Sequence, residues 1–445
     1  MNVLRQVEKI VIPSTRLQQQ KKLIVDNVLE LVQKQITNYP QVVGIEVGGS
    51  YAKGTWLPEK ADIDIFIKFQ TSVSEKDFAI LGKRIGFDAL KDFKPYVRYA
   101  EHPFVEAKIK DTKVNLVPCY DVEEGKWKSS ADRSTFHTKF MKRSLSESMK
   151  NEVRILKRFL VNNDIYGAEI ARQGFSGYVA EVLVLNFGSF LGVLKAVSDI
   201  KQGQIIGSAA KKFDTPVVIM DPVDSKRNLA AAISTDNVGN FVFASRAFLK
   251  NPSIRFFMPK KIQKAQKNVI KNTLVLTFKY RPRSPDIIWG QVKRATNSIA
   301  TQIGQAGFVV LKKSTLVEEN ASSATLLFLL QSTRLDESYL RVGPDFFSAD
   351  FSEKFILANK KKSIMMWVND DGKICSLQKR PQPDALLLVR NLLKKNIEKS
   401  GISAGLKEDI KRFNLVLGDK ITSKSIKEAL AKLVSTDETV FSSSR

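Results

Sequence analysis

The sequence predicts an α+β fold in three parts, because strand-like and helix-like patterns follow one another in proportions that change twice along the chain. Residues 1–140 mix helices with a small sheet, residues 141–255 are mainly helical, and residues 256–445 are again α+β and rich in lysine. A chain of 445 residues is long enough for two to four domains of roughly 100–200 residues each. We therefore expect three domains with boundaries near residues 140 and 255.

The first part begins with a helix and continues with strands. Ser14 or Thr15 can cap the helix, whose apolar positions recur at helical spacing, and Pro40 ends it. The expected strands are residues 42–47, 62–69 and 96–99, followed by the two arms of a hairpin, 104–110 and 113–117. The hairpin is expected to turn at Asp111-Thr112. These segments together predict one small sheet.

The second and third parts differ in their balance of helix and strand. The expected helices are residues 151–162, 177–197, 227–250 and 286–303. The expected strands are residues 274–278, 308–312 and 324–331.

The chain is strongly basic, with 71 Lys and Arg against 46 Asp and Glu, a formal net charge of +25 and a pI near 9.8. Lysines are frequent in residues 260–271 and 360–362. A single surface lysine usually serves only solubility. So large an excess favours a polyanionic partner such as RNA, because cations that neutralise phosphates release condensed counterions.

Several classes of protein are disfavoured by composition. The two cysteines, Cys119 and Cys375, argue against a disulfide scaffold and a zinc site, and the two histidines, His102 and His137, argue against a histidine-based metal centre. Residues 1–13 lack the apolar core of a signal peptide. The most apolar stretch, residues 179–197, contains Glu181 and Asn186, so we expect no membrane span and a cytoplasmic protein.

A glycine-rich turn follows the first expected strand. Gly48-Gly49 allows backbone N–H groups to approach a triphosphate closely, and Ser50 adds a hydroxyl donor. Lys53 supplies a full positive charge nearby. Most Gly-Gly-Ser turns are only turns, so this motif needs a second feature to indicate a nucleotide site.

That second feature is the pair Asp62 and Asp64 on the next expected strand. Residues at i and i+2 of a strand leave the same face, roughly 6–7 Å apart at the backbone. Paired carboxylates suit Mg²⁺, and two metal ions about 3.5–4 Å apart could activate an attacking hydroxyl and stabilise a leaving pyrophosphate. An isolated Asp-x-Asp is usually two solvated acids. In this chain the Asp pair follows the glycine turn by a dozen residues, and this combination favours nucleotidyl transfer.

With the Gly-Gly-Ser turn and the Asp-x-Asp pair, the chain resembles the polymerase β-type nucleotidyltransferases. Within them it resembles the archaeal (class I) CCA-adding enzymes, which are tRNA nucleotidyltransferases. The matching pieces are Gly48 to Leu57, Ala100-Glu101-His102-Pro103, Val117-Pro118-Cys119-Tyr120, Asp132-Arg133, Phe136-His137, Asn151-Glu152-Val153-Arg154, Ile165-Tyr166-Gly167-Ala168-Glu169, Gly174-Phe175-Ser176-Gly177-Tyr178, Asp221-Pro222-Val223-Asp224 and Lys226-Arg227-Asn228. They span residues 40–245, whereas the last third matches mainly in length and basic character.

The resemblance implies a fold, a reaction and a set of site residues. The fold would be a polymerase β-like catalytic domain, a helical central domain and basic α+β RNA-binding domains. CMP and then AMP would pass from CTP and ATP to the 3′ end of tRNA, and a homodimer would be compatible with the family. The implied site residues are Gly49, Ser50 and Lys53 at the triphosphate, Asp62 and Asp64 at Mg²⁺, His137, Lys157 and Tyr166 around the nucleotide, and Arg227 at the base.

One position departs from the family pattern. Where relatives usually carry a third carboxylate, four residues before Cys119, this chain has Asn115. Its amide oxygen can still coordinate Mg²⁺, but it has no charge and cannot act as a base. With the expected hairpin turn, Asn115 would pair with Lys108 and Glu106 would lie diagonally across on the same face, where we hypothesise that it partly substitutes.

Two other functions stay open on the sequence. A poly(A)-type polymerase of the same superfamily would extend RNA with A alone and ignore CTP. A non-catalytic tRNA-binding relative is suggested by Asn115 and would bind tRNA without incorporating nucleotides.

Overall fold

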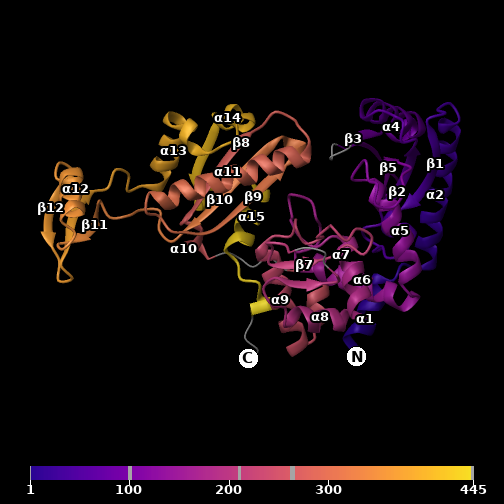
Figure 1. The fold of residues 1–445 in the computed structure, drawn as a ribbon, viewed down its shortest axis with the longest axis horizontal. Helices are drawn as coiled ribbons and strands as arrows, with labels where there is room; N and C mark the ends of the chain where they lie inside the picture. The colour runs from indigo at the N-terminus through magenta and orange to yellow at the C-terminus, as the bar shows by residue number, and fades with distance from the viewer. Residues whose placement is uncertain (1, 99–102, 209–211, 261–265, 442–445) are drawn as a thin grey trace. The chain divides into compact units, whose positions relative to one another are not determined.

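The computed structural model describes residues 2–98, 103–208, 212–260 and 266–441 of the chain. It divides into two compact units (Figure 1). Unit 1 comprises residues 1–261 together with 436–445, and unit 2 comprises residues 262–435. Residue 140 lies within unit 1, so the domain boundary predicted near it stays a prediction.

The first half of unit 1 is built on a five-stranded mixed sheet with the order β1-β2-β5-β4-β3. The strands are β1 (Val42–Gly48), β2 (Ile63–Phe69), β3 (Tyr96–Arg98), β4 (Phe104–Ile109) and β5 (Thr112–Tyr120). The helices are α1 (Asn2–Val11), α2 (Thr15–Ile36), the short α3 (Gly49–Lys53) and α4 (Glu75–Ala89). Ser14 caps α2 as expected, its Oγ accepting a hydrogen bond from Leu17 N at 3.3 Å.

The alternation that predicts a half-buried strand at residues 62–69 is confirmed. Ile63, Ile65, Ile67 and Phe69 are fully buried in a core that includes side chains of α2 and α4, both visible beside this sheet in Figure 1. Residue 64 points to the other face of the sheet, because strand side chains alternate. The hydrophobic face therefore anchors β2, and the opposite face carries Asp64 and Lys68 together with the buried Phe66.

The second half of unit 1 is mainly helical, as predicted. Its helices are α5 (Asp132–Ser144), α6 (Glu147–Asn162), α7 (Gly177–Phe187), α8 (Phe190–Ser198) and α9 (Thr235–Lys250), with the small strands β6 (Gln204–Ile206) and β7 (Val217–Ile219). The expected single helix 177–197 is wrong, since Gly188 has φ of 78° and α7 and α8 meet at a 90° bend. The last helix begins at Thr235 rather than residue 227, because residues 221–234 form turns.

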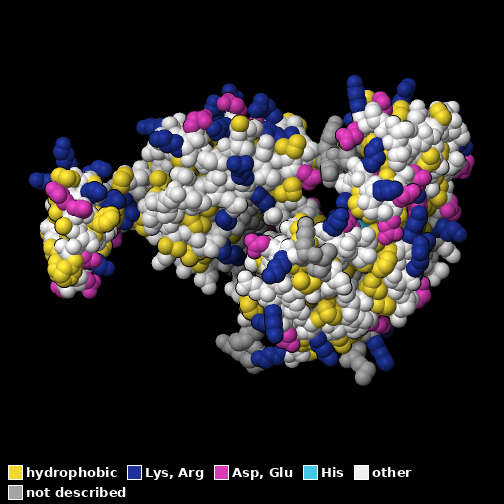
Figure 2. Space-filling model, in the orientation of Figure 1, with side chains coloured by type: hydrophobic (Ala, Val, Ile, Leu, Met, Phe, Trp, Pro, Cys, Tyr) yellow, Lys and Arg dark blue, Asp and Glu magenta, His cyan; other side chains and the backbone are white. Residues whose placement is uncertain are grey.

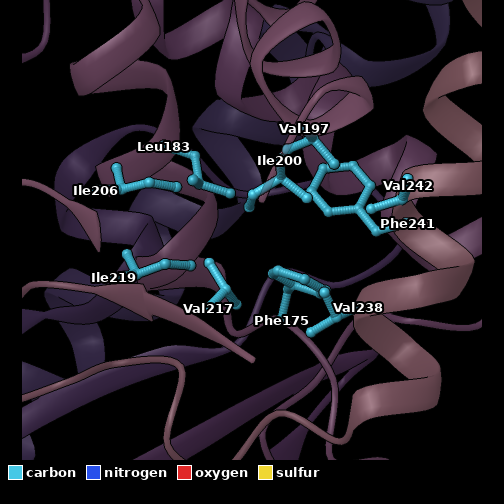
Figure 3. Close-up of a pocket in the computed structure, with 10 residues that line it drawn as sticks. All are labelled: Phe175, Leu183, Val197, Ile200, Ile206, Val217, Ile219, Val238, Phe241 and Val242. Atoms are coloured by element: carbon cyan, nitrogen blue, oxygen red, sulfur yellow. The ribbon is translucent and has the colours of Figure 1, made fainter. Parts of the chain in front are cut away.

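Among the described residues, no single helix is long and apolar enough to cross a membrane, and only the bent pair α7 and α8 meets that test together. Aliphatic and phenylalanine side chains of this half line a small pocket near α7, α9 and β7 (Figure 3). The pocket has no polar side chain that could hold a phosphate, so the candidate chemistry lies elsewhere.

Unit 2 contains a four-stranded sheet with the order β14-β8-β10-β9 and a three-stranded sheet with the order β11-β13-β12. The strands are β8 (Thr273–Lys279), β9 (Val310–Glu318), β10 (Ser323–Leu330), β11 (Ser338–Asp345), β12 (Ser363–Val368), β13 (Lys373–Lys379) and β14 (Phe413–Leu417). The helices are α10 (Lys267–Ile270), α11 (Pro285–Gln305), α12 (Ala349–Asn359), α13 (Ala385–Lys395), α14 (Ala404–Ile410) and α15 (Lys424–Val434). The strands expected at 274–278 and 324–331 are confirmed within a residue, while the one expected at 308–312 begins later and continues to Glu318.

The end of the chain returns to unit 1, where α16 (Glu438–Phe441) packs against α9 through Phe243 and Phe441. Lys260 pairs there with Asp437. The last described residues thus cluster with unit 1, and the predicted third part, residues 256–445, stays a prediction. Figure 2 shows Lys and Arg side chains over both units, and hydrophobic side chains on the part of unit 2 that carries α12.

A buried carboxylate joins the end of β5 to α5, the helix that carries His137. Asp132 is fully buried and accepts hydrogen bonds from the backbone N–H groups of Tyr120 at 2.8 Å, Lys128 at 2.8 Å and Ser129 at 2.7 Å. Such hydrogen bonds to a charged acceptor are strong, and a buried donor that loses its partner is destabilising.

We expect Asp132→Ala to lower the free energy of unfolding of unit 1 by about 3 kcal/mol, because several buried donors would lose their acceptor at once. Urea unfolding, followed by tryptophan fluorescence, measures the change. Asp121→Ala is the matched control, since Asp121 is exposed and contacts Lys68 at 3.4 Å. Equal urea midpoints for the two variants would contradict this assignment.

Candidate active site

Asp64 lies against the glycine turn that precedes it in the sequence. β1 and β2 are antiparallel neighbours, and their register places Gly48 opposite Asp64. Gly49 has φ of 66°, and a Cβ atom added there would lie 2.0 Å from Asp64 Oδ2. Residue 49 must therefore be glycine both for its left-handed backbone and for the close approach of this carboxylate. The structure brings together the two motifs that the sequence analysis paired.

Asp64 also begins a row of polar side chains that crosses the sheet. The register places Asp64 beside Asn115 on β5, Asn115 opposite Glu106 on β4, and Glu106 opposite Tyr96 on β3. Asn115 Nδ2 donates to Asp64 Oδ1 at 2.9 Å. The Tyr96 hydroxyl donates to Glu106 Oε1, and Arg98 Nε donates to Glu106 Oε2 at 3.4 Å.

The predicted turn of the hairpin is wrong by one residue, and the predicted strand pairing is therefore wrong by two residues. The chain turns at Lys110-Asp111, with Lys110 at φ of 53°, instead of at Asp111-Thr112. Thr112 belongs to the strand because it is buried and accepts a hydrogen bond from Lys21 Nζ at 2.7 Å. Glu106 is therefore the direct partner of Asn115, and Lys108 is not. Both Glu106 oxygens are engaged by Tyr96 and Arg98.

Asp62 and Asp64 form the acidic part of the site. Asp62 is half-buried just before β2, and Asp64 is half-buried on the strand. Burial raises the pKa of the Asp64 carboxyl, the hydrogen bond from Asn115 opposes this rise, and the negative charge of Asp62 adds to it. A carboxylate that is costly to ionise, placed beside a second negative charge, favours a nearby cation.

The residues present fit a divalent cation. Asn115 Oδ1 is buried and has no hydrogen-bond partner within the described part of the chain, so an oxygen lone pair is left beside Asp64. Carboxylate and amide oxygens are suitable ligands for Mg²⁺. In the ranges that the structure describes, no group of three or more His, Cys, Asp or Glu side chains is arranged to hold a metal. The third oxygen beside Asp62 and Asp64 would thus come from the amide of Asn115.

Two of the predicted cationic residues are buried and share one carboxylate. Lys53 Nζ, at the end of α3, donates to Glu181 Oε2 at 2.5 Å, and Lys157 Nζ, on α6, donates to Glu181 Oε1 at 3.0 Å. Thr55 Oγ1 donates to the same Oε1 at 2.5 Å. Burial lowers the pKa of Lys157 to about 8, although the charge of Glu181 acts in the opposite direction. Burial of Glu181 is outweighed by the two lysines, which lower its pKa to about 2.

Tyr166 lies beside Lys157, and Ser50 lies on the same short helix as Lys53. A Cβ atom on Gly177 would lie 2.8 Å from the Tyr166 hydroxyl and 3.4 Å from Lys157 Nζ, so both polar groups face the beginning of α7. Tyr166 is half-buried, and burial raises the pKa of its hydroxyl, which stays protonated at neutral pH. Ser50 lies half-buried in α3, next to Gly49. Three of the predicted nucleotide-binding residues, Lys53, Lys157 and Tyr166, therefore gather where α3, α6 and α7 meet.

A second carboxylate, Asp221, organises the other predicted residues. His137 Nε2 lies 2.9 Å from Asp221 Oδ2, and Arg227 Nη1 donates to the same oxygen at 3.3 Å. The Tyr178 hydroxyl donates to Asp221 Oδ1 at 3.0 Å, and its ring stacks on His137 with centroids 3.9 Å apart. Burial lowers the pKa of His137 despite the adjacent carboxylate. His137 and Arg227 are thus brought together on one carboxylate oxygen.

The sequence analysis missed the residues that hold the predicted ones in place. Glu181 was noted only as an interruption of an apolar stretch, and Asp221 and Tyr178 only as parts of matching motifs. The lone carboxylate in the apolar stretch 179–184 could have indicated a buried ion pair, because a buried Glu needs a buried cation. Nothing local predicts that its partners lie 128 and 24 residues away. Residues 99–102, which include the predicted motif around His102, lie outside the described residues.

Three family models match successive parts of the chain. Residues 25–141 match a nucleotidyltransferase domain, residues 151–258 match the second domain of tRNA nucleotidyltransferase, and residues 271–418 match the C-terminal domain of CCA-adding enzymes. The α+β architecture, with a polymerase β-like domain followed by these two, is therefore confirmed.

Whole-chain relatives agree with the family models. The CCA-adding enzyme of Saccharolobus solfataricus is 36% identical over 396 residues, which cover 88% of this chain and 91% of the relative. The CCA-adding enzyme of Pyrobaculum islandicum is 37% identical over 363 residues, covering 80% and 85% of the two chains. That of Sulfurisphaera tokodaii is 36% identical over 352 residues, covering 78% and 83%. With this identity along most of its length, the chain belongs to the archaeal-type CCA-adding enzymes, a family of tRNA nucleotidyltransferases.

Proposed function

We propose that this chain builds or repairs the CCA 3′ end of tRNA by adding CMP and then AMP from CTP and ATP, without a nucleic-acid template and with release of pyrophosphate. The observation that carries the proposal is the contact between Asp64 and Gly49, which joins a carboxylate pair to a phosphate-binding turn. Family membership supports the same reaction, and the match of residues 271–418 to a CCA-adding domain favours it over a poly(A)-type polymerase.

The acidic residues are assigned to the divalent metal. Asp62, Asp64 and Asn115 would hold Mg²⁺ through their side-chain oxygens. Bound metal supplies positive charge that favours ionisation of the attacking 3′-hydroxyl and offsets the charge that develops on pyrophosphate. The chain's own contribution is to fix these oxygens on two adjacent strands, so that little rearrangement accompanies the reaction.

The nucleotide is assigned to the two clusters beside the acids. Ser50, Lys53, Lys157 and Tyr166 would bind the triphosphate and ribose, since ammonium and hydroxyl groups suit phosphate oxygens. His137 and Arg227, held on Asp221, would contact the base. A guanidinium fork can donate to acceptors of both cytosine and adenine, which matches an enzyme that takes both nucleotides in turn.

The partners follow from charge and family. tRNA is the acceptor, and basic unit 2 would grip it mainly through phosphates and shape, because A-form RNA offers side chains little base readout. A homodimer and a cytoplasmic location stay predictions.

The primary test is incorporation of labelled CTP and ATP into tRNA transcripts that lack the terminal A, CA or CCA. We expect addition of the missing nucleotides and no more, with Mg²⁺ present. Asp64→Asn should reduce the rate by roughly 10³-fold or more, because it removes a charged ligand from beside the phosphate turn. Its tRNA affinity should stay unchanged, which filter binding at fixed salt measures.

Two outcomes would replace this proposal. Long A tails with CTP ignored would indicate a poly(A)-type polymerase. Tight, salt-sensitive tRNA binding without incorporation under any divalent metal would indicate a non-catalytic relative, the alternative that Asn115 suggests. The matched control for Asp64→Asn is Asp121→Asn, an exposed carboxylate just beyond β5 that contacts Lys68.

Asn115→Asp tests the third ligand. In the metal-free protein the new carboxylate would replace a 2.9 Å hydrogen bond with a like-charge contact to Asp64, so the melting temperature should fall. Divalent metal should restore more stability to this variant than to the wild type, and incorporation should rise by roughly tenfold or more. Thermal unfolding with and without Mn²⁺, and calorimetric Mn²⁺ binding, measure the first effect independently of activity.

Asn115→Ala is the control, because it removes the unpartnered oxygen without adding charge. It should bind Mn²⁺ more weakly than the wild type. Equal Mn²⁺ affinity in the wild type, Asn115→Ala and Asn115→Asp would show that residue 115 is not a ligand. A tighter metal site without a faster reaction would instead indicate that another group already compensates for the missing carboxylate.

A further inference from the structure

Glu181 is the most deeply buried charged group next to the proposed nucleotide site, and none of the roles assigned above uses it. It is fully buried on α7, surrounded in sequence by apolar residues. Oε2 accepts from Lys53, and Oε1 accepts from both Thr55 Oγ1 and Lys157 Nζ. Both oxygens are occupied inside the protein, so Glu181 acts on the lysines and not directly on a substrate.

The two ammonium groups depend on this carboxylate. Lys53 is 7% exposed and Lys157 is 1% exposed, and an ammonium group removed from water without an anionic partner tends to lose its proton. Within the described residues, Glu181 is the one carboxylate hydrogen-bonded to Lys157, whose other acceptors are Thr55 O at 3.1 Å and Thr55 Oγ1 at 3.0 Å. Lys157 keeps a pKa of about 8 in the presence of this partner.

The other ionisable groups around the cluster do not replace Glu181. Arg154 on α6 and Lys53 on α3 are cations, and their charges lower the pKa of Lys157 further. Tyr178 on α7 lies with its ring 5.3 Å from Lys53 Nζ, and burial raises the pKa of its hydroxyl, so it is neutral. Tyr166 is neutral for the same reason. The remaining anions around the cluster are Asp62 and Asp64 of the acidic site, Glu169, whose charge acts on Tyr166, and Asp221, which accepts from the Tyr178 hydroxyl.

We propose that Glu181 is a positioning residue that keeps Lys157 protonated and holds Lys53 beside it, so that two positive charges are ready for a nucleoside triphosphate. The inference rests on the proposed function, because it takes Lys53 and Lys157 to be the triphosphate ligands. Glu181 ties together α3, the segment at Thr55, α6 and α7, and it thereby couples the charge of the site to its geometry.

The test is the pH dependence of nucleotide affinity in the wild type and in Glu181→Gln. Binding of a non-hydrolysable CTP analogue with Mg²⁺ is measured by calorimetry from pH 6.5 to pH 9. A lysine loses its charge as pH rises, so wild-type affinity should fall as pH passes about 8. In Glu181→Gln the fall should move down by at least about one pH unit, which makes binding roughly tenfold weaker near pH 8.

A charge-locked variant separates this effect from a general loss of structure. The guanidinium group stays protonated throughout this pH range. Glu181→Gln combined with Lys157→Arg should therefore lose the additional pH dependence of Glu181→Gln. Glu152→Gln is the matched control, because Glu152 is a carboxylate on α6 that accepts from Phe190 N at 2.8 Å. It should retain the wild-type pH profile.

Identical pH profiles for the wild type and Glu181→Gln would overturn the inference. If Glu181→Gln does not fold, Glu181→Asp decides the question. The shorter side chain holds its carboxylate farther from the lysines, so the loss of CTP-analogue affinity should still move to lower pH. An unchanged pH profile in this variant would overturn the inference. A wild type that binds no CTP analogue at any pH would instead refute the proposed triphosphate site, and the inference with it. The two failures are therefore distinguishable.

Discussion

The contact between Asp64 and Gly49 is the constraint on which the rest of the site depends. Asp64 Oδ2 occupies the space that a Cβ atom would need at residue 49, and the left-handed φ of Gly49 starts α3 directly from the end of β1. The same backbone path that admits the carboxylate thus places Ser50 and Lys53 next to it. β2 can present Asp64 here because its other face is anchored by fully buried Ile63 and Ile65.

Positive charge is organised differently from negative charge in this protein. Asp62 and Asp64 are half-buried, whereas Lys53 and Lys157 are buried against Glu181. A buried ion pair contributes little net stability, because desolvation offsets much of the Coulomb attraction. A cluster with two cations and one anion, however, keeps an unbalanced positive charge in a place where water cannot screen it. That arrangement is costly for folding and suited to a polyanionic substrate, which fits a functional role better than a structural one.

The elements that follow from local pattern were predictable, and those that depend on tertiary contacts were not. The alternation at residues 62–69 predicts a strand whose main apolar face carries residues 63, 65, 67 and 69, and the structure has that strand. The helix break at Gly188 and the hairpin turn at Lys110 were not predicted. One continuous helix and two bent helices fit the same apolar pattern at Gly188, and turns at 110–111 and 111–112 fit the same strand pattern. Tertiary packing decides between the alternatives in each case. In the same way, sequence matching indicated Lys157, but only the fold shows that its carboxylate partner is Glu181.

Asn115 is consistent with the structure around it even though it departs from the family. A carboxylate at this position would face Asp64 at hydrogen-bond distance, and the metal-free site would carry three mutually repelling acids including Asp62. The amide replaces one repulsion with a hydrogen bond and leaves its oxygen unpartnered. By this reasoning the amide would make the metal-free protein easier to fold and a bound metal harder to retain. The identity of residue 115 would then adjust how strongly the site depends on a metal, while the register of β2 and β5 fixes where Asp64 and residue 115 lie.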